Sequence, residues 1–128
     1  IGRAWLNSEA RNMIRAYPLT GAGIGSFIIE LGKRAGEGYV VEPAHNIFLL
    51  AGAELGIPGL LLVIALFISF VYRLFKTQDP NAILAGAILT GLGVISMFDH
   101  YLWTVAPSRL MLGLMIGLFV GQGINHDA

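Results

Sequence analysis

The chain has 128 residues, and its eight Lys and Arg balance eight Asp and Glu to a formal net charge of zero. Only 12% of its residues are charged and 55% are hydrophobic, which is a membrane-like composition, since soluble domains carry about 25% charged residues. A neutral chain lacks a sequence-independent electrostatic grip on nucleic acid, and a chain without cysteine has neither disulfides nor thiolate chemistry. Because it opens with Ile1 rather than Met, we expect a fragment of a longer protein.

The first part of the chain carries most of the formal charge and is expected to face water. Residues 5–17 are predicted to form an amphipathic helix, with Arg11 and Arg15 one turn apart and Pro18 at its end. The glycine-rich turn that follows lacks the strand and the Lys-Ser/Thr of nucleotide-binding loops, so we interpret it as structural. Residues 27–31 are either a short helix or an extended piece, and residues 32–38 are predicted to be a polar loop.

Three apolar segments of about membrane length follow, at residues 46–72, 82–98 and 108–124. Arg73 and Lys76 close the first segment. In the third, the four-residue spacing of Gly113, Gly117 and Gly121 predicts a face for close helix packing. The predicted fold is all-α and integral to the membrane, with short amphipathic helices ahead of about three transmembrane helices. The alternative has two spans and a third segment lying in the membrane interface.

The centre of the pattern is the stretch P-A-H-N-I-F-L-L-A-G-A-E-L-G-I-P-G at residues 43–59. Pro43 favours a helix start, with His45 in the first turn. There the helix dipole favours neutral imidazole, which is a base near pH 7. Gly56 and Pro58 predict a kink or break about three turns later.

This stretch, with the upstream pattern R-x14-P-x2-G-x-G from Arg3 to Gly23, resembles the C-terminal half of the O-antigen ligase/polymerase superfamily, the Wzy/WaaL-type membrane glycosyltransferases. The resemblance implies an inverting, metal-independent glycosyl transfer without a cofactor. The donor would be an undecaprenyl-diphosphate-linked glycan, and the acceptor a hydroxyl of a lipid or glycan. It also implies a multi-pass protein of the bacterial inner membrane, with residues 1–44 as an extracytoplasmic segment and residues 45–128 as the transmembrane region.

The positive-inside rule puts the turn with Arg73 and Lys76 in the cytoplasm, and His45 on the outer side. Lys33 and Arg34 make the number of positive charges that flank the first span nearly equal on its two sides. The family resemblance therefore settles the orientation, and it implies a periplasmic active-site loop.

The resemblance implies two catalytic residues. His45 matches the family's central histidine, which serves as a base for the acceptor hydroxyl or as a partner of the departing diphosphate. Arg3 matches an arginine that holds the donor's diphosphate, because a guanidinium bonds two phosphate oxygens at once and keeps its charge. The plainer interpretation of Arg3 is a solvated charge at a helix start.

The candidate substrate contacts are Arg11, Asn46, Glu54, Asp99 and His100. Glu54 is costly to bury unpaired within a span, so we expect it to face protein or a water-filled cavity, on the opposite side of the helix from His45. Asp99, His100 and His45 are scattered along the chain without metal-ligand spacing, and the family is not known for a metal, so we predict no metal ligands. Arg109 is either a snorkelling anchor or a partner of Asp99.

Two functions of other classes remain open. A transporter or flippase fragment would use the broken first span and Glu54 as a midplane substrate site. It should lose function on a change of Glu54 and keep it on a change of Arg3, whereas a ligase should do the reverse. A purely structural subunit would tolerate both changes.

Overall fold

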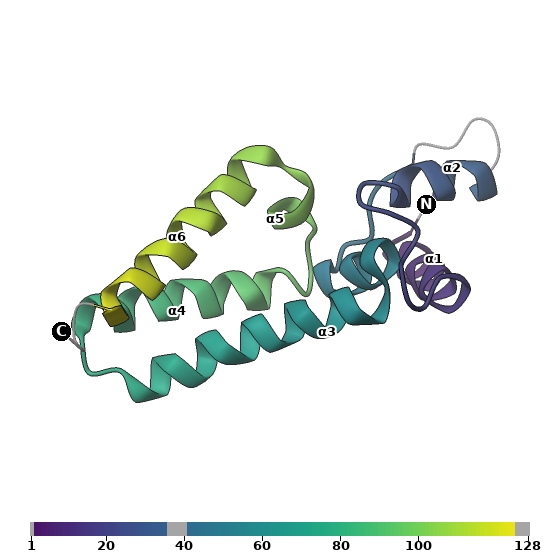
Figure 1. The fold of residues 1–128 in the computed structure, drawn as a ribbon. Helices are drawn as coiled ribbons and strands as arrows, with labels where there is room; N and C mark the ends of the chain where they lie inside the picture. The colour runs from purple at the N-terminus through teal and green to yellow at the C-terminus, as the bar shows by residue number, and fades with distance from the viewer. Residues whose placement is uncertain (1, 36–40, 125–128) are drawn as a thin grey trace.

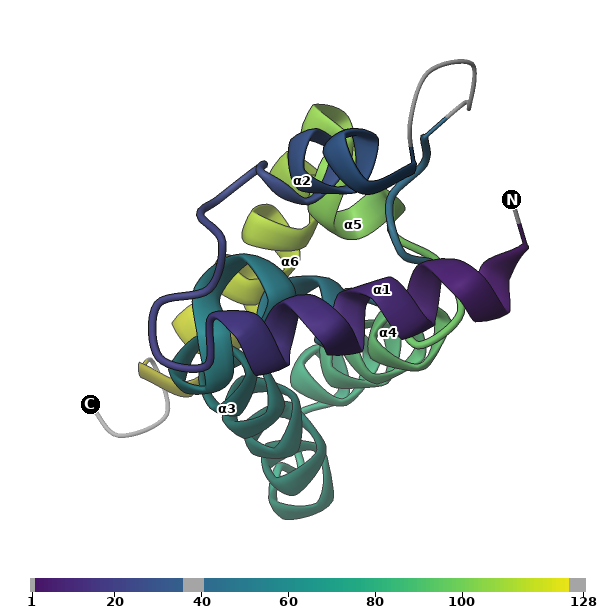
Figure 2. The same cartoon turned by 90° about the vertical axis from the view of Figure 1, so that its right-hand side faces the viewer.

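Six helices make up the part of the chain that a computed structural model describes, residues 2–35 and 41–124 (Figure 1). They are α1 Arg3–Ala16, α2 Phe27–Ala35, α3 Ile47–Lys76, α4 Pro80–Ile95, α5 Tyr101–Thr104 and α6 Ala106–Ile124. α1 lies across the first turns of α3 with α2 beside it, as Figure 2 shows. α4 runs back along the rest of α3, and α6 packs on α4 (Figure 1). The all-α prediction is confirmed.

One described helix is both long and apolar enough to cross a membrane. It is α3, with 30 residues, and only 11% of its apolar window is buried, whereas the core helix of a soluble protein is mostly buried. α4 and α6 are apolar but shorter. Length and composition therefore support one of the three predicted spans.

α3 begins at Ile47, so the prediction of a start near Pro43 with His45 in the first turn is wrong. Asn46 is the N-cap, and its Oδ1 accepts a hydrogen bond from the backbone N–H of Leu49 at 3.0 Å. Asparagine is among the strongest N-caps because its side chain satisfies a donor that the first turn leaves free. His45 therefore lies just ahead of the helix.

The predicted break in α3 is confirmed at Gly56, whose φ of 75° and ψ of −172° are accessible to glycine but not to most other residues. The glycine-rich turn, residues 18–23, docks against this break through its backbone. The connecting hydrogen bonds run from Ala22 N to Ala53 O (2.8 Å), from Gly23 N to Glu54 O (3.0 Å) and from Ile57 N to Pro18 O (2.7 Å). The turn thus supplies partners for backbone groups that the interrupted helix leaves free.

Glycine is required on both sides of this contact. A Cβ on Gly21 would overlap the backbone carbonyl of Glu54, and a Cβ on Gly56 would lie 2.8 Å from the carbonyl oxygen of Pro18. The two backbones approach so closely that neither position has room for a side chain.

α2 resolves the choice left open for residues 27–31, because they form a helix that continues to Ala35. The prediction of a loop from residue 32 is therefore wrong for residues 32–35, where Lys33 Nζ lies 2.6 Å from Glu30 Oε1 one turn earlier. Residues 36–38 of the predicted loop lie outside the described residues.

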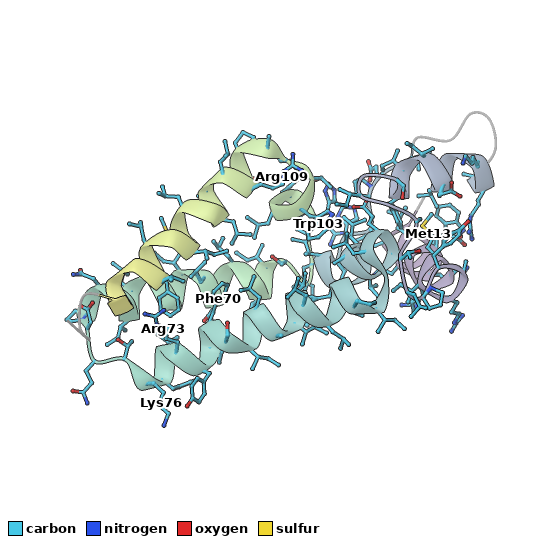
Figure 3. All side chains as sticks on the ribbon, viewed as in Figure 1. Met13, Phe70, Arg73, Lys76, Trp103 and Arg109 are labelled. Atoms are coloured by element: carbon cyan, nitrogen blue, oxygen red, sulfur yellow. The ribbon has the colours of Figure 1, made fainter. Side chains whose placement is uncertain are left out.

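Two glycines of α4 allow aromatic rings of α3 and α6 to pack closely against this helix. A Cβ on Gly86 would lie 2.9 Å from the Phe119 ring of α6, and a Cβ on Gly93 would overlap the Phe67 ring of α3. Phe119 also meets Phe70 of α3 edge to face, with ring centroids 5.9 Å apart (Figure 3). By contrast, a Cβ would meet nothing within 4 Å at Gly113, Gly117 or Gly121. The predicted packing face of α6 is therefore wrong for the described part of the chain.

Candidate active site

Hydrogen bonds tie the start of α3 to the end of α4. The backbone N–H of Ile47 donates to the carbonyl oxygen of Ser96 at 2.8 Å, and Asn46 Nδ2 donates to the carbonyl oxygen of Met97 at 3.0 Å. Asn46, predicted as a substrate contact, thus has both its side-chain nitrogen and its capping oxygen engaged within the fold. Its position holds residues 45 and 99 close together although they are far apart in the sequence.

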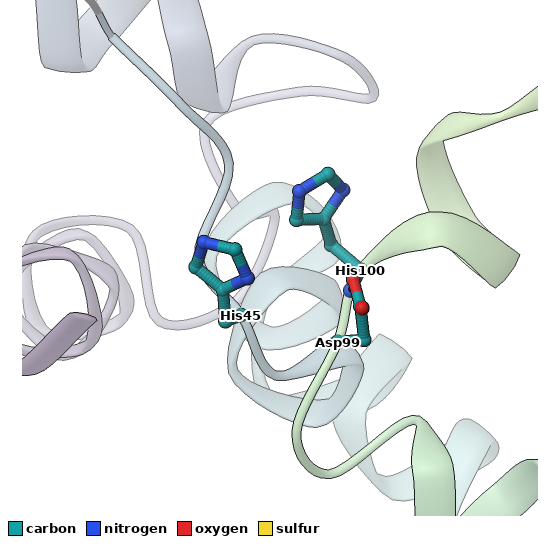
Figure 4. Close-up of side chains that lie close together, drawn as sticks. All are labelled: His45, Asp99 and His100. Atoms are coloured by element: carbon teal, nitrogen blue, oxygen red, sulfur yellow. The ribbon is translucent and has the colours of Figure 1, made fainter.

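His45, Asp99 and His100 converge at this junction (Figure 4). One imidazole nitrogen or carboxylate oxygen from each residue lies within 4.8 Å of those from the other two. The imidazole ring centroids are 5.0 Å apart. The expectation that these residues are scattered is wrong, because it considered only sequence spacing.

The orientation of His100 is set by Thr104. His100 Nδ1 lies 2.8 Å from Thr104 Oγ1, and this hydroxyl donates its own proton to the backbone carbonyl of His100 at 3.2 Å. The hydroxyl therefore accepts from Nδ1–H, which leaves the lone pair on Nε2. Burial lowers the pKa of His100 and the adjacent His45 lowers it further, while Asp99 and Glu42 oppose the shift. His100 is accordingly neutral near pH 7.

His45 has one nitrogen facing a carboxylate and one without a partner. Nε2 lies 3.7 Å from Glu42 Oε2, whereas Nδ1 is buried and has no hydrogen-bond partner among the described residues. Buried polar atoms without a partner are uncommon and call for an explanation, such as a catalytic role. Nδ1 of His45 is thus an atom of this cluster that has no partner within the described part of the fold and is a candidate proton acceptor.

Glu54 lies apart from the cluster and is only 4% exposed. Its Oε1 accepts from the backbone N–H of Phe27 at the start of α2 (3.3 Å), and its Oε2 accepts from Trp103 Nε1 of α5 (2.9 Å). The prediction that Glu54 faces protein is confirmed. The carboxylate joins α2, α3 and α5, and Trp103, which sequence analysis did not select, is its side-chain partner.

Trp103 of α5, labelled in Figure 3, lines two cavities. One, of about 230 Å³, takes its polar lining from Glu54, Thr104 and Arg109. The other, of about 130 Å³, lies among α3, α4 and α6 and is lined almost wholly by apolar side chains. The histidine cluster lines neither cavity, but Thr104, the hydrogen-bond partner of His100, connects it to the larger one.

The predicted arginines lie outside the cluster. Arg3 and Arg11 are on the exposed side of α1, and neither forms an ion pair with any residue that the structure describes. Arg109 is exposed at the first turn of α6 and forms no ion pair with Asp99 within the described part of the chain. Three of the predicted site residues therefore meet: His45, Asp99 and His100.

Residues 2–64 match a protein-family model described as O-antigen ligase. This match confirms the resemblance to the O-antigen ligase family over residues 2–64. The family match includes Arg3, the glycine-rich turn, His45 and Glu54, and it ends within α3 beyond the break. No curated protein and no solved structure matches the chain. At the level of the family, the match implies a glycosyltransferase-type activity in polysaccharide synthesis.

Replacing Trp103 by phenylalanine tests how much its hydrogen bond to Glu54 stabilises the fold. The variant leaves Glu54 Oε2 buried without its donor, so the free energy of unfolding should fall by about 1–3 kcal/mol. The measurement is the melting temperature of the purified full-length protein in detergent. Trp5→Phe, at an exposed tryptophan, is the control and should melt like the wild type. Equal melting temperatures for both variants would contradict the assigned role of Trp103.

Proposed function

We propose that this chain is the part of an O-antigen ligase or polymerase that transfers a glycan from an undecaprenyl-diphosphate carrier to a hydroxyl of a lipid or glycan acceptor. The observation that carries the proposal is the meeting of His45, which lies within the family match, with Asp99 and His100. The family match includes His45, and Nδ1 of the same residue is a basic nitrogen without a partner among the described residues.

His45 is the base of the proposed reaction. Its Nδ1 accepts the proton of the acceptor hydroxyl while the hydroxyl oxygen bonds to the anomeric carbon of the donor sugar. The bond from that carbon to the diphosphate oxygen breaks, and its electron pair leaves with undecaprenyl diphosphate. Attack opposite the leaving group inverts the anomeric centre. The carboxylate of Asp99, close to the imidazole, stabilises the imidazolium that forms.

Arg3 holds the diphosphate of the donor in this proposal. Its guanidinium is exposed and has no ion-pair partner among the described residues, so it is available to a ligand. A planar guanidinium bonds two phosphate oxygens and neutralises the charge that develops on the leaving group, so the reaction proceeds without a metal ion. Arg11, two turns further along α1, adds positive charge for the same ligand.

The lipid carrier requires a site at a membrane surface. α3 has the length and composition of a span, and we place α4 and α6 beside it in the bacterial inner membrane, with the His45 cluster on the periplasmic side. The apolar cavity of about 130 Å³, next to Trp103, suits the first isoprene units of the carrier.

The proposal is tested with the full-length protein in membranes, a lipid-diphosphate glycan as donor, and EDTA present. We expect the wild type to transfer glycan in the presence of EDTA, and the product to show an inverted anomeric configuration by NMR. The transfer rate of Arg3→Ala should be lower by at least about 10²-fold. Arg34→Ala is the matched control, because this exposed arginine of α2 only approaches Glu9 at 3.7 Å, and it should keep the wild-type rate. Transfer by Arg3→Ala at the wild-type rate would overturn the proposed mechanism. So would the loss of wild-type transfer in EDTA.

A further inference from the structure

We infer that His45, Asp99 and His100 also form a binding site for a borderline transition-metal ion such as Zn²⁺, and that metal bound there blocks glycosyl transfer. The binding stands on the geometry of the three side chains. The block rests on the proposed function, so the two parts have separate measurements.

The three residues offer two imidazoles and one carboxylate, a donor set that Zn²⁺ uses in proteins. Their donor atoms lie within 4.8 Å of one another. Ligand atoms around a tetrahedral Zn²⁺ ion are about 3.3 Å apart, so shifts of about 1 Å bring these atoms to bonding distance. Side-chain rotation supplies shifts of that size, and a fourth position stays open to water.

The free lone pairs belong to the atoms that a metal would use. Glu42 Oε2 lies 3.7 Å from Nε2 of His45, and Thr104 Oγ1 lies 2.8 Å from Nδ1 of His100. In the tautomers that put the ring protons on these two nitrogens, Nδ1 of His45 and Nε2 of His100 carry the free lone pairs. Metal-binding histidines almost always have such a partner on the second nitrogen. Asp99 Oδ1 accepts from the backbone N–H of His100 at 2.6 Å, so its other oxygen is available.

A metal on this site competes with catalysis. Nδ1 of His45, which is buried and has no hydrogen-bond partner among the described residues, is also the proposed proton acceptor. Once this lone pair is bonded to a metal, it no longer accepts the proton of the acceptor hydroxyl. Zn²⁺ should therefore inhibit, whereas Mg²⁺, which prefers oxygen ligands, should have little effect.

Binding is measured by titrating Zn²⁺ into the purified full-length protein and following heat or competition with a zinc indicator. We expect the wild type to bind one Zn²⁺ ion. The affinities of Asp99→Asn and His100→Gln for Zn²⁺ should be at least about 10-fold lower than that of the wild type. Glu30→Gln, which removes a carboxylate paired with Lys33 on α2, is the matched control and should bind like the wild type. Equal affinities of all four proteins would overturn the site.

Inhibition is measured in the transfer assay. Zn²⁺ should slow the wild type, EDTA should restore the rate, and the residual activity of His100→Gln should need about 10-fold more Zn²⁺ for the same inhibition. If Zn²⁺ binds at the site and the transfer rate does not fall, the proposed inhibition by Zn²⁺ is wrong. If the wild type has no transfer activity but binds Zn²⁺ more tightly than Asp99→Asn and His100→Gln, the metal site is upheld. That outcome counts against the proposed function alone.

Discussion

Replacing His45 by alanine is expected to lower the rate of glycosyl transfer by about 10²- to 10⁴-fold, the usual contribution of a general base. The fold should survive, because Nδ1 has no partner among the described residues and Nε2 approaches Glu42 only at 3.7 Å. A contact of this length to the exposed carboxylate of Glu42 contributes little to stability. The apparent KM for the donor should change little, since Arg3 holds the diphosphate in the proposed mechanism.

The measurement compares initial rates in membranes with melting temperatures of the purified wild type and variant. Free imidazole in the assay is the control, because it replaces the missing base and should restore part of the rate to His45→Ala. A purely structural role of His45 would show no such rescue. Transfer by the variant at the wild-type rate would remove His45 from the mechanism.

Replacing Gly21 by alanine should destabilise the protein by about 3–5 kcal/mol, which combines the strain of a positive φ with overpacking. Gly21 has a φ of 66°, and the added Cβ would overlap the backbone carbonyl of Glu54. The turn at residues 18–23 then has to leave the break in α3, and the backbone groups that it satisfies lose their partners.

Gly25→Ala is the matched control for this prediction. Gly25 has a similar φ of 73°, but a Cβ there would meet nothing within 4 Å. It carries the same conformational strain without the clash and should cost only about 1–3 kcal/mol. The measurement is the melting temperature in detergent, together with the yield of monodisperse protein. Equal losses in the two variants would show that the close contact at Gly21 does not stabilise the fold.

The break in α3 was predictable because its signals are local. Gly56 and Pro58 weaken any helix that contains them, whatever surrounds it. The turn that docks on the break was not predictable, since backbone hydrogen bonds between distant segments leave no pattern in side chains. The start of α3 was misplaced because Pro43 and Asn46 both favour a helix start, and the side-chain cap of Asn46 prevails.

The candidate site was predictable one residue at a time. His45 stands out by its position ahead of an apolar segment, but its meeting with Asp99 depends on the bonds of Ile47 and Asn46 to the end of α4. Trp103 had a signal that sequence analysis left unused. A carboxylate buried in an apolar helix needs donors, and an indole N–H in a loop at the same end of the helices is a suitable one.

In the proposed membrane arrangement, the break in α3 also sets the height of the reacting groups above the lipid. The part of the helix after the break, residues 57–76, has about 20 residues and is therefore about 30 Å long, one hydrocarbon thickness. It carries no formal charge until Arg73, near its far end. In that arrangement the turns before the break project from the bilayer, and they would bring His45 to the level where a polyprenyl carrier, anchored by its own tail, presents its diphosphate.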